Sequence, residues 1–115
     1  DTLILLDFSL NRMKDVIKNL RVNEKKMIEN LNNTKGLYNS QRVLLKLIDK
    51  GLTRESAYRI VQKIALESWK KNLEFKFLLK KNKEIKKFID SKEIDKIFDL
   101  NYHFKNINYI FKKLT

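Results

Sequence analysis

The chain has 115 residues, enough for one domain with a modest core, and a formal net charge of +12 at pH 7. It has no proline, no cysteine and only two glycines, which argues against a turn-rich β-sandwich or barrel and excludes both disulfides and cysteine-ligated metal. The longest apolar run, residues 3–6, is far shorter than the ~20 residues of a membrane span. The composition therefore predicts an all-α protein with short polar turns, and the lack of cysteine fits a reducing, intracellular compartment.

The positive charge has two interpretations. A basic chain can bind nucleic acid or an anionic membrane surface. Alternatively, the lysines cover an ordinary solvated surface, because lysine outnumbers arginine 21 to 5 and arginine makes most bidentate contacts to bases and phosphates. We favour the solvated surface, although lysine alone can still drive non-specific phosphate binding.

The first predicted helix covers about residues 2–20. Its apolar side chains recur at spacings of three and four, at Leu3, Leu6, Leu10, Met13, Ile17 and Leu20. The opening turn differs from the rest, because residues 3–6 are all apolar and point to every side of the axis. We expect another chain segment or another subunit to cover that turn; the alternative is that it forms an edge of this domain's own core.

Capping residues and glycines divide the middle of the chain. Asn23 is the expected N-cap of a short second helix, which the polar residues 32–36 end. A third helix is predicted over about residues 37–50, with Gly51 at the left-handed position that follows a helix. Thr53 is the expected N-cap of the fourth helix.

Small residues in the fourth helix, Ala57, Ala65 and Ser68, allow close helix approach. The apolar residues Phe75, Phe77, Leu78 and Leu79 follow, and the lysine-rich residues 80–87 are predicted to form a solvated turn. Ser91 is the expected N-cap of a short helix, and residues 107–114 form the last predicted element.

Residues that could carry chemistry are few. His103 is the single histidine, and with Asp99 four residues earlier it could form an oriented base; we favour a structural histidine, because no nucleophile or second base stands nearby. The carboxylates alternate with lysines, which surface charge patterning explains at least as well as acid–base catalysis. Two isolated glycines cannot form a phosphate-binding loop.

Several segments resemble the carboxy-terminal signature of the adenylosuccinate lyases, a family of the fumarase/aspartase superfamily. The central matches are Ser-Gln-Arg-Val-Leu-Leu at residues 40–45, Gly-Leu-Thr-Arg-Glu-Ser-Ala-Tyr at residues 51–58, Val-Gln at residues 61–62, and Trp69. The family commonly has an apolar residue where Asn39 stands here.

Flanking segments extend the resemblance over essentially the whole chain, in the family's order and spacing. They are residues 5–7, 11–12 and 18–20, which resemble the end of the family's central helical bundle, and residues 98–103 and 106–107, which resemble its closing segment.

The resemblance implies a three-domain, mostly helical subunit that assembles into a homotetramer around a central helix bundle. Residues 1–22 would end that bundle, and residues 23–115 would form the carboxy-terminal helical domain. The implied reaction eliminates fumarate from adenylosuccinate, giving AMP, and from SAICAR, giving AICAR, in cytoplasmic purine biosynthesis, with no metal or organic cofactor.

The resemblance also implies that the catalytic residues lie outside this chain. Family members use a histidine pair and a serine on a mobile loop, and the loop motif Gly-Ser-Ser-x-Met-Pro-x-Lys is absent. The serine and arginine that hold the substrate phosphate would precede Asp1, which is not a methionine, so we expect a longer polypeptide. We assign no catalytic, cofactor or metal residue, and expect an inactive segment that supplies scaffold and active-site wall.

Arg42 is the one candidate for a substrate contact. Together with Gln41 it opens the third predicted helix, where it could face an anionic ligand or a carboxylate of a neighbouring domain. We favour a structural interdomain pair, because the start of a helix also suits ordinary capping contacts.

Three functional hypotheses follow. The first is the carboxy-terminal domain of a lyase, whose partners are the rest of its polypeptide, its homotetramer and a purine nucleotide substrate, with neither nucleic acid nor membrane. The second is a stand-alone basic helical module that binds nucleic acid, which needs lysines and arginines gathered on one face. The third is a helical adaptor, against which the signature segments argue.

Overall fold

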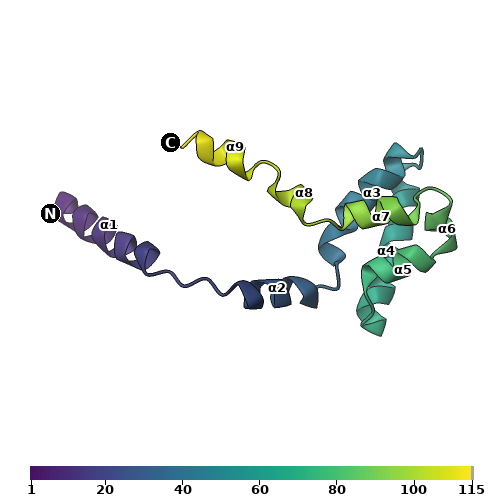
Figure 1. Cartoon of the computed structure of the whole chain (residues 1–115), viewed down its shortest axis with the longest axis horizontal. Helices are drawn as coiled ribbons and strands as arrows, with labels where there is room; N and C mark the ends of the chain where they lie inside the picture. The colour runs from purple at the N-terminus through teal and green to yellow at the C-terminus, as the bar shows by residue number, and fades with distance from the viewer. Residues whose placement is uncertain (115) are drawn as a thin grey trace.

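The fold of residues 1–114 was taken from a computed structural model, and it is all-helical in this range, as the composition predicts. The elements are α1 (Thr2–Lys18), α2 (Glu24–Asn33), the 3-10 turn η1 (Leu37–Asn39), α3 (Ser40–Asp49), α4 (Arg54–Lys71), α5 (Phe75–Lys81), α6 (Lys83–Lys86), α7 (Ser91–Ile97), α8 (Asn101–Phe104) and α9 (Ile107–Lys112). Figure 1 shows α3 to α7 gathered into one body, from which two arms extend: α1 with α2, and α8 with α9. The elongated chain measures 65 × 32 × 26 Å.

The core lies among α3, α4, α5, α6 and α7. Apolar side chains from these helices and from the link before α7 are almost fully buried: Val43, Leu47, Ala57, Val61, Ile64, Phe75, Leu78, Leu79, Ile85, Ile89, Ile94 and Ile97. The small residues Ala57 and Ser68 are completely buried, as the close approach of α4 to its neighbours requires. The Ser68 hydroxyl donates to the Leu73 carbonyl at 2.6 Å, which ties the end of α4 to the next turn.

Two predicted N-caps are confirmed. The Asn23 side chain accepts a hydrogen bond from the Lys26 amide at 3.0 Å and begins α2. The Thr53 hydroxyl accepts from the Ser56 amide at 3.3 Å and begins α4. Each side chain satisfies an amide that has no partner within its own helix.

The prediction of a solvated turn over residues 80–87 is wrong. Helix α5 continues to Lys81, and α6 begins directly after Asn82, whose side chain accepts from the amides of Glu84 and Ile85 at 2.9 and 3.1 Å. Ile85 is completely buried. One apolar anchor and one capping residue therefore keep a lysine-rich segment helical.

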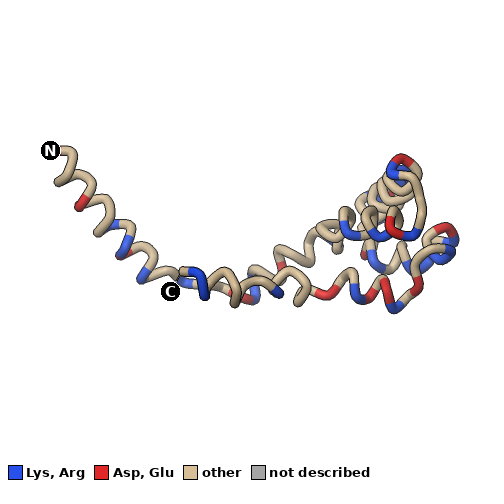
Figure 2. Tube along the Cα trace, turned by 90° about the horizontal axis from the view of Figure 1, so that it is seen from above, with Lys and Arg blue, Asp and Glu red and all other residues tan. Residues whose placement is uncertain are grey.

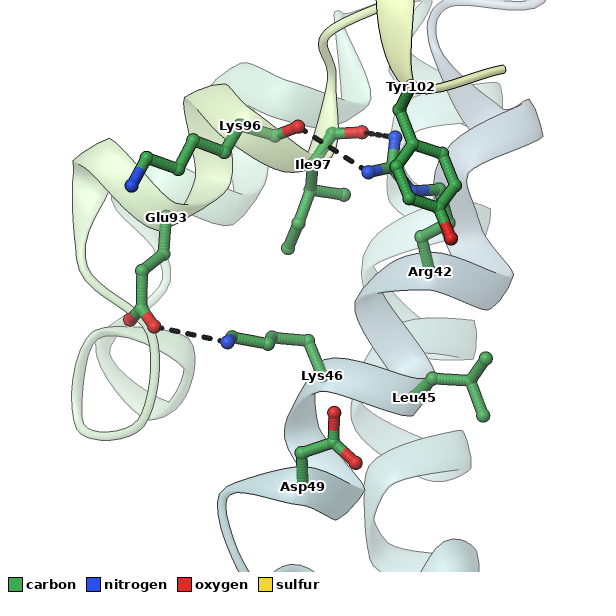
Figure 3. Close-up of a pocket in the computed structure, with 8 residues that line it drawn as sticks. All are labelled: Arg42, Leu45, Lys46, Asp49, Glu93, Lys96, Ile97 and Tyr102. Atoms are coloured by element: carbon green, nitrogen blue, oxygen red, sulfur yellow. Dashed lines mark hydrogen bonds and ion pairs between the residues drawn. The ribbon is translucent and has the colours of Figure 1, made fainter. Parts of the chain in front are cut away.

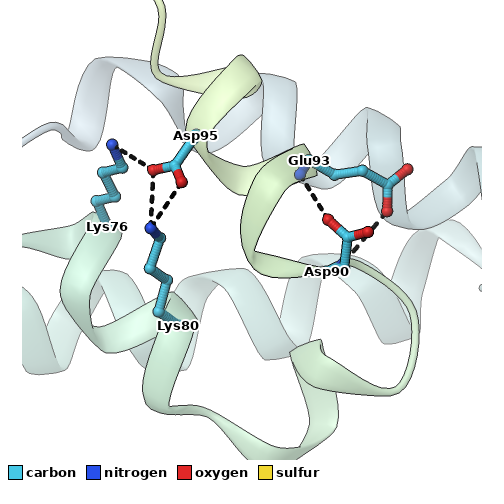
Figure 4. Close-up of polar contacts among 5 residues, drawn as sticks. All are labelled: Lys76, Lys80, Asp90, Glu93 and Asp95. Carbon is cyan, nitrogen blue, oxygen red and sulfur yellow. Dashed lines mark hydrogen bonds and ion pairs between the residues drawn. The ribbon is translucent and has the colours of Figure 1, made fainter.

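The N-cap of α7 is Asp90 rather than the predicted Ser91, which is the first residue inside the helix. Figure 4 shows the reciprocal contacts: the Glu93 amide donates to Asp90 at 2.7 Å, and the Asp90 amide donates to the Glu93 carboxylate at 3.2 Å. This capping box satisfies two amides at once, so it fixes the start of α7 more firmly than a single serine would.

Helix α1 ends at Lys18, two residues before the predicted end, and none of its side chains is buried. The opening turn is exposed on all sides, with Leu3 at 80% and Leu6 at 54%. Among residues 1–114, no helix has the length and apolar character needed to cross a membrane. The domain boundary after residue 22 and the identity of the segment that covers α1 stay predictions.

Both arms leave the core at one place, which we call the junction: Lys35, Gly36 and Tyr38 on the first arm's side, and Phe98 and His103 on the second. Lys35 and Gly36 both have left-handed backbones, at φ 54° and 80°. The Phe75 amide donates to the Lys35 carbonyl at 2.9 Å, and the rings of Tyr38 and His103 meet edge to face at 6.3 Å. The directions of the two arms are thus set together.

We expect Gly36→Ala to destabilise the protein more than Gly51→Ala does. Both glycines have positive φ, so each substitution costs about 1–2 kcal/mol for the left-handed backbone. A Cβ on Gly36 would also lie 2.8 Å from the Phe98 ring, whereas a Cβ on Gly51 meets nothing within 4 Å. Denaturant unfolding followed by circular dichroism measures both losses, and equal losses would show that Phe98 does not restrict the junction.

Candidate functional site

Three cations at intervals of four residues form a row that lies against α7: Arg42 and Lys46 on one face of α3, and Lys50 at its C-cap. Arg42 contacts the carboxy-terminal end of α7, while Lys46 and Lys50 contact Glu93 near its amino-terminal end. Because residues four apart lie on the same side of a helix, α3 holds α7 at both ends with side chains from a single face.

The Arg42 guanidinium has three contacts. Its Nη1 donates to the Ile97 carbonyl, and its Nη2 lies 3.5 Å from the Lys96 carbonyl. The centre of the guanidinium stands 3.8 Å from the centre of the Tyr102 ring, a cation–π arrangement. Carbonyls at the end of a helix lack partners within that helix, so Arg42 both caps α7 and holds the first turn of α8.

Glu93 is the anionic counterpart of this row. Its carboxylate lies 2.9 Å from the Lys50 ammonium and 3.3 Å from that of Lys46, and it also accepts from the Asp90 amide. These contacts, with the Lys50 hydrogen bond as the largest cause, lower the pKa of Glu93 from 4.5 to about 2.

Asp95 holds the other flank of α7. It lies 2.7 Å from the ammonium groups of both Lys76 and Lys80, one turn apart on α5 (Figure 4). The hydrogen bond from Lys76, followed by that from Lys80, lowers the pKa of Asp95. The short helix α7 is therefore fixed from both sides by carboxylates that stay charged at neutral pH.

A cleft of about 390 Å³ lies between α3 and α7, in the position drawn in Figure 3. It is lined by Arg42, Leu45, Lys46, Asp49, Glu93, Lys96, Ile97 and Tyr102. Its charges are mixed, and Arg42, Lys46 and Glu93 already contact other protein groups. In residues 1–114, no three His, Asp or Glu side chains converge closely enough to hold a metal ion.

Gln41 and Arg42, neighbours in the sequence, line different clefts. Gln41 borders a second groove of about 250 Å³ between α3 and α4, together with Ser40, Leu44, Tyr58, Val61, Gln62 and Ala65. Most of these residues belong to the Ser-Gln-Arg, Ala-Tyr and Val-Gln motifs. The signature thus contributes to two surfaces on opposite sides of α3.

His103 lies among aromatic rings rather than against a carboxylate. Its ring meets those of Tyr102 at 5.6 Å and Tyr38 at 6.3 Å, both edge to face. Asp99 instead accepts a hydrogen bond from the Asn101 amide at 3.0 Å, at the start of α8. This arrangement favours the structural histidine over the oriented base.

Sequence reasoning missed the contacts of Lys46, Lys50, Glu93 and Tyr102. The spacing of four from Arg42 through Lys46 to Lys50 and the Asp-x-x-Glu pattern at residues 90–93 were both visible as local signals. What neither signal contains is the pairing of the two segments, because Arg42 and Ile97 are 55 residues apart.

Known proteins resemble this chain over nearly all its length. Residues 36–114 match the family model described as adenylosuccinate lyase C-terminus. The curated adenylosuccinate lyase of Thermotoga maritima is 46% identical over 99 residues, covering 86% of this chain and 23% of that protein. The adenylosuccinate lyase of Bacillus subtilis is 45% identical over 114 residues, covering 99% of this chain and 26% of that protein. The adenylosuccinate lyase of Helicobacter pylori is 43% identical over 124 residues, covering 99% of this chain and 28% of that protein. The chain therefore spans about a quarter of the length of these relatives.

Lys50→Ala should raise the pKa of Glu93 from about 2 toward its ordinary 4.5, because Lys50 donates the hydrogen bond that lowers it most. Titration of the Glu93 carboxyl carbon by NMR measures the shift. A charged Glu93 stabilises the fold above about pH 4.5, and this contribution is lost as the pH falls toward 2. Lys63→Ala on α4 is the control, and an unchanged Glu93 titration in Lys50→Ala would contradict the assignment.

Arg42→Ala should lower the free energy of unfolding by about 1–3 kcal/mol, because it removes charge-assisted hydrogen bonds to α7 and the contact with Tyr102. Arg42→Lys should recover only part of this loss, since an ammonium cannot bridge both carbonyls while covering the ring. Gln41→Ala, on the other face of α3, should stay within about 0.5 kcal/mol of the unchanged protein. Equal losses for Arg42→Ala and Gln41→Ala in urea unfolding would show that the contacts of Arg42 with α7 and Tyr102 do not stabilise the fold.

Proposed function

The chain belongs to the adenylosuccinate lyase family and matches the carboxy-terminal part of its members, and from this premise we propose that it serves as the carboxy-terminal domain of such a lyase. The proposed reaction eliminates fumarate from adenylosuccinate, giving AMP, and from SAICAR, giving AICAR, in cytoplasmic purine biosynthesis. In this proposal the catalytic residues lie elsewhere in a longer polypeptide, and residues 1–115 supply scaffold and part of the active-site wall.

The exposed apolar surface of α1 is the observation that supports a larger assembly. Leu3, Leu6 and Leu10 are each more than half exposed, although apolar side chains of this size are normally buried. An apolar stripe that continues around the whole opening turn needs cover on several sides. In this proposal a central bundle shared by four subunits supplies that cover.

The contacts of Arg42 support a structural role for this residue. Its guanidinium is occupied by the Ile97 carbonyl and the Tyr102 ring. An anionic substrate would have to compete with both contacts. The favoured role is therefore to hold α7 and α8 in place through the Ile97 carbonyl and the Tyr102 ring; the structural interdomain pair that the sequence suggested stays a prediction.

The distribution of charge favours the lyase over a nucleic-acid-binding module. Figure 2 shows lysines and arginines along both arms and over the body; acidic residues lie among them on α1, on α2 and over the body, and the sequence has none after Asp99. A module that follows a phosphate backbone needs its cations gathered on one face. The net charge of +12 can still help to attract a multiply anionic nucleotide substrate.

The test uses the polypeptide that carries residues 1–115 at its carboxy-terminal end. We expect it to release fumarate from adenylosuccinate, followed by absorbance, whereas residues 1–115 alone release none because they lack the catalytic residues. Binding of the isolated chain to random duplex DNA is measured in parallel at several salt concentrations. Absence of turnover by the longer polypeptide, together with tight and steeply salt-dependent DNA binding, would replace the lyase with the second hypothesis.

A further inference from the structure

The carboxy-terminal arm, α8 with α9, has an amphipathic surface that the core does not cover. Ile107 and Ile110 on α9, and Leu114 two residues beyond its end, recur at spacings of three and four and are 41%, 54% and 76% exposed. Asn108 and Lys112 lie on the opposite side of α9, together with Tyr109. An apolar stripe with a polar opposite side is typical of a helix that packs on another surface.

The position of this arm is fixed where it leaves the core. Arg42 holds Tyr102 in the first turn of α8, and the His103 ring meets Tyr38. At the same junction Phe98 lies against Gly36, from which the other arm departs. The apolar stripe of α9 is thus carried in a defined direction and not on a loose tail.

The two arms extend to the same side of the body and remain apart from each other. Figure 1 shows α9 and α1 extending from the core in the same general direction, with open space between them. Both carry uncovered apolar side chains, including Leu10 on α1 and Ile110 on α9. Whatever covers α1 therefore lies on the side toward which α9 also points.

A layer of helices fits this arrangement better than a lipid surface does. The opening turn of α1 is apolar all round, whereas a helix lying on a membrane needs a polar face toward water. Helices cover the apolar stripes of other helices by interlocking side chains. The relatives also have about three quarters of their length outside the region matched here, which is ample for a bundle of helices.

We propose that α8 and α9 form a strap that docks on the central helix bundle to which α1 contributes, with Ile107, Ile110 and Leu114 buried against it. This inference rests on the proposed function, because the bundle belongs to the longer lyase. The strap and α1 then hold the carboxy-terminal domain to the bundle at two separate places, while the junction sets the angle between them.

Amide hydrogen exchange tests the strap. Exchange of residues 107–114 is compared between the 115-residue chain and the longer polypeptide, with residues 43–48 in the core as the internal reference. We expect the arm to exchange at least about tenfold more slowly in the longer polypeptide, because docking protects its amides. Equal rates in the two proteins overturn the proposal.

Paired substitutions identify the docking face. Ile110→Asp in the longer polypeptide should return residues 107–114 to rapid exchange, and Asn108→Asp on the opposite side should leave them protected. In the 115-residue chain, Ile110→Asp should not change the melting temperature, because the stripe lies outside the core. An equal effect of both substitutions overturns the assignment of the face.

Two further measurements separate the strap from the alternatives. If vesicles rich in anionic lipid protect α9 in the 115-residue chain while the longer polypeptide leaves it exposed, a membrane replaces the bundle as its partner. Fumarate release is measured on the same preparations. An active polypeptide with an unprotected α9 overturns the strap alone, whereas an inactive polypeptide with a protected α9 overturns the proposed reaction and not the docking.

Discussion

The contacts of Arg42, Lys46 and Lys50 with α7 determine the arrangement of the carboxy-terminal half of this chain. A helix of seven residues is too short to be stable by itself, so its position depends on contacts with its surroundings. Ile94 and Ile97 bury its inner face, and ion pairs hold Glu93 and Asp95 on its two flanks. Arg42 then fixes its last turn and the start of α8. Everything that follows α7 takes its direction from this one short helix.

This organisation suits a scaffold. Several charged groups connect helices, and the two clefts beside α3 are shallow surfaces rather than enclosed sites. Part of the positive charge is also paired inside the domain, since four lysines form ion pairs with Glu93 or Asp95: Lys46, Lys50, Lys76 and Lys80. Large apolar side chains remain exposed on both arms, including Leu3 and Ile110, and also on the body, including Tyr58 and Trp69.

Sequence patterns predicted the helical class, the starts of α1, α2, α4 and α9, and the family, but only part of the tertiary contacts. Asn23 and Thr53 were recognisable because capping is a local interaction. Residues 80–87 were misjudged because their charge suggested solvent, while a single buried side chain, Ile85, decides their structure. The role of Arg42 depends on a partner 55 residues away, which no local pattern specifies. Asn39, noted as a departure from the family, is completely buried, and its side-chain amide has no hydrogen-bond partner within residues 1–114; the sequence indicated an unusual position there without explaining it.

The contact between Gly36 and Phe98 has a consequence for how such a domain can change during evolution. Each residue marks the departure of one arm, and Gly36 cannot gain a Cβ without displacing the Phe98 ring. Substitutions at positions 36 and 98 are therefore expected to occur together, or to be accompanied by a change in the angle between the arms. Divergence elsewhere in the arms is less restricted, so the angle between the two arms can persist in proteins whose outer surfaces have become very different.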